Sequence, residues 1–285
     1  MSHIHNVDAS TKKLYIAVAI NILLTIAQVV GGLLSGSLSL MADALHNFSD
    51  AGAILIAVIA RKIGQIPPNP TMTYGYQRAE TLGTLINSVS LILIGVYLIY
   101  ESVGRYANPQ PIEGSVVIWV AGIALVIDIA TALLTYSAGA KDNMNIRAAF
   151  IHNVSDAMAS VVVIVAGILI ILYQWYVVDL VATIGISLYV IFHGFALMRK
   201  AILIVMQATP DGIDVNEVKE ALEKIQGIQK VFHIHIWQLD DQRICFEGHV
   251  VFSSSSNASD LKKIMRDRLQ TQFDIDHSTI DANLG

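Results

Sequence analysis

A five-residue motif occurs twice in this chain, as His46-Asn47-Phe48-Ser49-Asp50 and as His152-Asn153-Val154-Ser155-Asp156. On a helix, residues four apart share one face, so each copy presents its His and its Asp about one turn apart. Both copies interrupt apolar stretches of the length that crosses a bilayer, where an ionisable side chain is costly and usually functional. The doubled motif therefore predicts a site inside a membrane for a positively charged ligand.

The residue types indicate which ligand this is. Imidazole nitrogen and carboxylate oxygen bind zinc and its first-row neighbours well, and four such ligands make a tetrahedral shell. The doubled motif supplies that number with His46, Asp50, His152 and Asp156. Two carboxylates also balance the charge of a divalent cation, so the loaded site is neutral within the membrane. Because a histidine must lose its proton to bind metal, protons and metal compete, which is the minimum requirement for metal/proton antiport.

Other roles for the doubled motif are hydrogen bonding between helices and a proton relay, but two near-identical copies favour ion coordination. A membrane-embedded zinc metalloenzyme would need an open coordination position and typically an HExxH signature, which this sequence lacks. A zinc sensor would not require paired ligands in the membrane. We therefore expect a transporter and not an enzyme.

Four further ionisable residues lie in the apolar stretches, and Asp179 is the one near the start of the sixth. Asp43 lies on the same helical face as His46, and it either orients that histidine or is simply a polar residue near the start of its span. Asp128 either faces the cavity or bonds a neighbouring helix. His193 is expected near the membrane interface.

The composition indicates an integral membrane protein, because 54% of the 285 residues are hydrophobic and only 14% are charged. Six apolar segments are long enough to cross a bilayer. They are Leu14–Leu34, Leu38–Ala60, Leu82–Tyr100, Val116–Ser137, Ala148–Tyr173 and Val177–Met198. The expected organisation is an N-terminal tail over residues 1–13, a six-helix transmembrane domain over 14–208, and a cytoplasmic domain over 209–285.

Basic residues between the spans predict the orientation, because cytoplasmic loops are enriched in Lys and Arg. One side holds Lys12, Lys13, Arg61, Lys62, Arg78, Lys141, Arg147, Arg199 and Lys200, and the other holds only Arg105. Both termini are therefore expected in the cytoplasm, with the protein in the cell inner membrane.

The segment after Thr209 reads as a small α+β domain. Asp214 can cap a helix over Val215–Ile225, and two β-rich runs form a hairpin. A second helix reaching about Leu269 and a last strand near Ser278–Ile280 complete a ferredoxin-like arrangement.

In these features the chain resembles the zinc-type branch of the cation diffusion facilitator family. The motifs that carry the resemblance, besides the doubled one, are Met41-Ala42-Asp43-Ala44-Leu45-His46, Tyr74-Gly75-Tyr76-Gln77-Arg78-Ala79-Glu80, Asn143-Met144-Asn145-Ile146-Arg147, Thr209-Pro210-Asp211-Gly212 and His233-Ile234-His235-Ile236-Trp237. The resemblance implies a homodimeric antiporter in the lipid bilayer that exports zinc in exchange for protons, with no nucleic-acid partner. Two histidines with two aspartates imply zinc first, with cadmium, cobalt or another divalent metal as the alternative.

The resemblance also implies a second zinc site in the cytoplasmic domain, where the ion would be structural or regulatory. The matching positions are His233, His249, His277 and Asp281, with Asn283 where an acidic residue is usual. The alternative is that His233 and His235, at alternate strand positions, are ordinary surface residues. Arg78 matches a position that forms an intersubunit salt bridge in some relatives, but Gln207 offers no acidic partner for it. The doubled motif is thus expected to be the metal site that transport requires.

Overall fold

The computed structural model describes residues 22–137, 144–240, 243–253 and 258–284. The chain divides into two compact units, Met1–Leu55 with Ile86–Ala196, and Ile56–Leu85 with Leu197–Gly285. Helices α2, α3 and α6 contribute to both units, and each unit is described by itself below.

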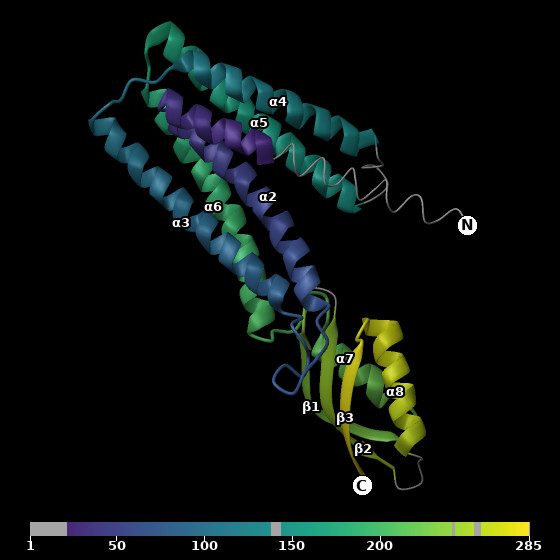
Figure 1. Ribbon diagram of the computed structural model, residues 1–285. Helices are drawn as coiled ribbons and strands as arrows, with labels where there is room; N and C mark the ends of the chain where they lie inside the picture. Colours follow the sequence, from purple (N-terminus) through teal and green to yellow (C-terminus); the bar gives the residue numbers. More distant parts are fainter. Residues whose placement is uncertain (1–21, 138–143, 241–242, 254–257, 285) are drawn as a thin grey trace. The chain divides into compact units, whose positions relative to one another are not determined.

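The long helices coincide with the predicted spans (Figure 1). They are α2 (Leu38–Gly64), α3 (Ala79–Ala107), α4 (Gly114–Ser137), α5 (Met144–Tyr173) and α6 (Val177–Val205). An apolar helix, Ile22–Ser35, precedes them. It covers most of the first predicted span, whose residues 14–21 lie outside the described residues. The turn between this helix and α2 is made at Gly36, whose φ of 73° suits glycine because it has no Cβ.

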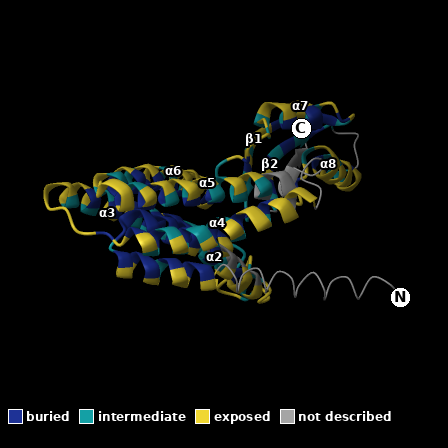
Figure 2. Ribbon diagram, turned by 90° about the horizontal axis from the view of Figure 1, so that it is seen from above, coloured by how far each residue is buried: buried dark blue, intermediate teal, exposed yellow. Residues whose placement is uncertain are grey.

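Four of the described helices, α3, α4, α5 and α6, are long and apolar enough to cross a membrane. Helix α2 is long enough too, but it carries Asp43, His46 and Asp50. The helical membrane class with a C-terminal α+β domain is confirmed, and the number of six spans stays a prediction. Apolar side chains face outward along these helices, such as Leu93, Trp119 and Phe192, which are 64, 75 and 73% exposed (Figure 2). A soluble monomer rarely exposes so much apolar surface, whereas a bilayer accommodates it.

Helices α4 and α5 pack closely along their length (Figure 1). A Cβ added at Gly114 would lie 2.8 Å from the carbonyl oxygen of Gly167, and one added at Gly167 would lie 2.8 Å from Ile118 Cγ1. Small residues allow such a close approach, which is typical of membrane helix pairs. This contact helps to hold α5, the helix that carries the second copy of the motif.

The C-terminal segment forms α7 (Val215–Glu223), β1 (Ile228–Gln238), β2 (Ile244–Phe252), α8 (Ala258–Phe273) and β3 (His277–Leu284). The sheet has the order β1-β2-β3, with β1 and β2 antiparallel and β2 and β3 parallel. Asp214 caps α7 as predicted, accepting a hydrogen bond from the Asn216 amide at 2.7 Å. Buried side chains such as Leu222, Phe246 and Met265 join the helices to the sheet in one apolar core. The α+β prediction is therefore confirmed, although β3 is longer than predicted.

Candidate metal site between α2 and α5

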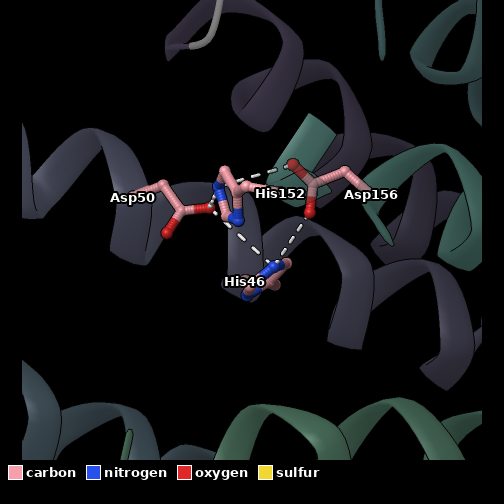
Figure 3. Close-up of side chains that lie close together, drawn as sticks. All are labelled: His46, Asp50, His152 and Asp156. Atoms are coloured by element: carbon pink, nitrogen blue, oxygen red, sulfur yellow. Dashed lines mark hydrogen bonds and ion pairs between the residues drawn. The ribbon is translucent and has the colours of Figure 1, made fainter. Parts of the chain in front are cut away.

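The two copies of the motif meet across α2 and α5 (Figure 3). His46 Nε2 lies 3.1 Å from Asp156 Oδ1, and His152 Nε2 lies 3.2 Å from Asp50 Oδ2. The contacts within each helix are longer, at 3.8 Å for His46 with Asp50 and 3.5 Å for His152 with Asp156. Each imidazole therefore contacts a carboxylate of its own helix and, more closely, one of the opposite helix.

These distances match the spacing of ligands around a tetrahedral metal. Zinc bonds of ~2.0–2.1 Å place neighbouring ligand atoms ~3.3 Å apart at the corners of a tetrahedron. The four measured contacts range from 3.1 to 3.8 Å, and one ligand atom from each residue lies within 4.8 Å of all the others. The cluster can therefore receive a small divalent cation with only minor side-chain shifts.

The cluster is buried on one side and accessible on the other. The side chains of His46 and Asp156 are 7 and 9% exposed, whereas those of Asp50 and His152 are 33 and 42% exposed. The buried side and the more exposed side of the cluster each hold one histidine and one carboxylate.

Asp179, to which the sequence alone assigned no role, fixes the start of the helix that carries His46 and Asp50. This fully buried carboxylate of α6 accepts hydrogen bonds from Ser37 Oγ at 2.6 Å and the Leu38 amide at 2.8 Å, and further ones from Ser39. A carboxylate on the free amides at a helix N-terminus acts as a cap and suits the helix dipole. The cap comes from a distant part of the chain, so no local sequence signal could have revealed it.

Asp43 does not orient His46. The Asp43 carboxylate accepts a hydrogen bond from Gln28 Nε2 at 2.6 Å, and Asn47 Nδ2 donates to Gln28 Oε1 at 2.9 Å. His46 Nδ1 is buried and has no hydrogen-bond partner among the described residues. The orienting role proposed for Asp43 was therefore wrong, because the amide of Gln28 from the preceding helix occupies its carboxylate.

Asp128 bonds a neighbouring helix, accepting a hydrogen bond from Ser160 Oγ of α5 at 3.1 Å. This confirms the second of its two predicted roles. His193 on α6 is exposed, and its ring packs against Tyr189 with centroids 4.5 Å apart. The Tyr189 ring in turn lies edge-on to His46, at 5.7 Å. An aromatic side chain of α6 thus flanks the buried histidine of the cluster.

The predicted site residues of the C-terminal domain lie at two separate positions. His249 Nδ1 lies 3.0 Å from Asp281 Oδ2, and the rings of His233 and His249 lie 5.1 Å apart. A register irregularity between Phe232 and His235 brings His233 to this position, with a φ of 52°. His277, at the other end of β3, instead contacts the Tyr74 ring, with centroids 6.2 Å apart. Three of the four predicted residues therefore gather, and His277 does not join them.

The protein is helical and multi-pass, with side chains of the kinds that bind metal clustered between two helices, and it carries an α+β domain. This is the architecture of a membrane cation transporter. Residues 14–206 match the family model of the cation efflux transmembrane domain, and residues 210–283 match that of the cation efflux protein cytoplasmic domain. The chain therefore belongs to the cation efflux family, the cation diffusion facilitators, which are transporters and not enzymes.

Similar proteins cover nearly the whole chain. A cadmium, cobalt and zinc/H(+)-K(+) antiporter of Bacillus subtilis is 34% identical, over 98% of this chain and 89% of its own length. The zinc transporter ZitB of Pectobacterium atrosepticum is 32% identical, over 98% and 87%. The proton-coupled zinc antiporter SLC30A2 of Rattus norvegicus is 32% identical, over 94% and 79%.

Proposed function

We propose that this protein exports zinc from the cytoplasm in exchange for protons, through a tetrahedral site made by His46, Asp50, His152 and Asp156. The observation that carries this proposal is the crossed arrangement of the two motifs, with His46 3.1 Å from Asp156 and His152 3.2 Å from Asp50. Four ligands of the types that zinc prefers are thus within coordinating reach, and their two carboxylates balance its charge.

Proton exchange follows from the same ligands. An imidazole can bind metal only in its neutral form, so loading the site with zinc expels protons and an acidic compartment favours release. Relatives named as proton-coupled zinc and zinc/H(+)-K(+) antiporters support this coupling. Cadmium or cobalt is the alternative cargo, as the name of the Bacillus subtilis relative indicates.

Residues 14–208 act as the transport domain and residues 209–285 as a cytoplasmic domain, with both termini in the cytoplasm of an inner-membrane protein. The basic residues that gather on one side of the predicted spans support this orientation. The protein works as a homodimer. The match of residues 210–283 to the family model of the cytoplasmic domain, which is named for its dimer, supports this. A second zinc ion, held by His233, His249 and Asp281, serves a structural or regulatory role, which the distance of 3.0 Å between His249 Nδ1 and Asp281 Oδ2 supports.

Zinc flux into vesicles tests the transport site. The purified protein is reconstituted with a zinc-sensitive dye inside and a pH gradient across the membrane. Asp50→Asn and Asp156→Asn each remove one charged ligand with little change of volume, so initial zinc flux should fall at least about tenfold. Proton movement, followed with a second dye, should fall with it.

Glu101→Gln is the matched control, because it removes the charge of one carboxylate in the same compact unit at a residue that pairs with Arg105 and not with the cluster. It should keep most of the flux. Undiminished zinc flux in both ligand variants would disprove the site. Zinc flux that neither moves protons nor responds to the pH gradient would disprove the exchange.

A further inference from the structure

A pocket of about 370 Å³ lies where the segment before α3 meets the end of β1. It is separate from the metal cluster, and all of its walls belong to one compact unit. Most of its lining is aromatic or aliphatic, with a single cationic side chain. The residues used below are Met72, Tyr74, Arg78, Leu82 and Trp237.

Arg78 is the charged group of this pocket, and the described part of the chain gives it no acidic partner. Its Nε donates to the carbonyl oxygen of Leu239 at 3.4 Å, and the described residues offer its other guanidinium donors no further acceptor. Glu80 is exposed and forms no ion pair with it, and Gln207, which lines the same pocket, is uncharged. A guanidinium with free donors at a pocket wall is suited to a phosphate, which it binds through paired hydrogen bonds.

The position of the pocket indicates where such a phosphate comes from. Arg78 immediately precedes Ala79, the first residue of α3, which is long and apolar enough to span a membrane. Tyrosine and tryptophan are enriched at the level of lipid headgroups, and Tyr74 and Trp237 line this pocket. Met72 and Leu82 are 46 and 49% exposed beside them. An apolar wall next to a guanidinium that can donate to a phosphate fits a phospholipid better than a free phosphate ion.

We propose that this pocket binds an anionic phospholipid of the adjacent leaflet, with its phosphate on Arg78 and its glycerol and upper acyl chains against Met72 and Leu82. Because Tyr74 precedes a membrane helix and Trp237 belongs to β1, one bound lipid contacts both the transmembrane segment and the α+β domain. The proposal does not depend on the identity of the transported ion.

Native mass spectrometry of the full chain in detergent tests the proposal. The protein is supplied with phosphatidylglycerol or phosphatidylcholine, and the fraction carrying one lipid is measured. Wild type should bind phosphatidylglycerol more tightly. Arg78→Gln should weaken that binding about fivefold, the effect typical of one basic residue at an anionic membrane surface. Arg78→Lys keeps the positive charge and should retain most of the preference.

Arg266→Gln, the same substitution on the exposed surface of α8, is the matched control and should bind both lipids as wild type does. The proposal is overturned if wild type binds the two lipids equally or if Arg78→Gln keeps the preference. Displacement of phosphatidylglycerol by inorganic phosphate would make free phosphate the ligand instead. A loss of dimer in Arg78→Gln without a change in lipid binding would assign Arg78 to a second copy of the chain.

Discussion

Ionisable side chains in the membrane-spanning part of this protein have two kinds of surroundings. Asp43 and Asp128 accept hydrogen bonds from neutral donors, Gln28 and Ser160, on neighbouring helices. The residues of the doubled motif instead pair with one another, imidazole against carboxylate. A carboxylate that a neutral side chain satisfies contributes to packing, whereas carboxylates that share histidines are suited to exchange those partners for a cation, as proposed above. The hydrogen-bond partner of an aspartate, and not the residue type, therefore distinguishes the packing residues from the candidate metal ligands.

Replacing Gln28 tests the structural role assigned to Asp43. Gln28→Leu removes the donor to the Asp43 carboxylate, which is 1% exposed, and should destabilise the protein by about 1–3 kcal/mol. Thermal unfolding in detergent measures the loss. Asn47→Ala is the comparison, because it leaves the bond between Gln28 and Asp43 in place and should cost less. Equal stability of wild type and Gln28→Leu would contradict the role.

At the scale of the elements, the metal cluster depends on how two helices are held. Helix α5 packs tightly against α4 through Gly114 and Gly167. Helix α2 begins at a cap supplied by Asp179 of α6, so the first turn of α2 is tied to a helix distant in sequence. Because His46 lies about two turns beyond this cap, a change in the cap shifts one half of the cluster relative to the other.

Asp179→Ala tests this dependence. The substitution leaves several buried donors at the start of α2 without an acceptor, so stability should fall by about 2 kcal/mol or more. Asp179→Asn keeps one side-chain oxygen and should recover part of the loss. Zinc affinity, measured by calorimetry on the folded protein, should weaken in Asp179→Ala although no ligand has changed. Lower stability with unchanged zinc affinity would limit Asp179 to a role in folding.

At the scale of the whole molecule, the chain joins a membrane unit that carries four clustered ligands to an α+β domain that carries three residues of a predicted second site. Parallel pairing of β2 with β3 places His249 opposite Asp281, and the irregularity in β1 adds His233. The same strand places His277 at its other end, beside Tyr74. The proposed second site and the proposed transport site therefore share no residue.

His249→Ala separates the two sites. It should lower the zinc bound at equilibrium by about one ion per chain, because it removes the central member of the C-terminal cluster. Zinc flux should continue, since the cluster between α2 and α5 is intact. Elemental analysis of the dialysed protein gives the zinc content. His277→Ala should leave the zinc content unchanged, and a decrease equal to that of His249→Ala would place His277 in the site after all.

The membrane class, most helix positions and the residues of the doubled motif could be predicted from the sequence, because these depend on local patterns. Hydrophobic length marks α3 to α6, and the spacing of His46 and Asp50 puts both on one helical face. Asp214 was recognisable as a cap because it precedes the helix that it caps. The predicted domain boundaries and the orientation of the termini remain predictions.

The partner of each polar residue could not be predicted in this way, because the two residues of a pair lie far apart in sequence and are brought together by helix packing. Asp179 caps α2 from 141 residues away at Leu38, and Gln28 bonds the Asp43 carboxylate, for which orienting His46 was one of two predicted roles. His46 meets Asp156 across 110 residues, and this crossing turns two helical pairs into one four-ligand cluster. A sequence motif gives the spacing of residues along one helix. Metal coordination depends on distances between helices, and these are set by helix packing.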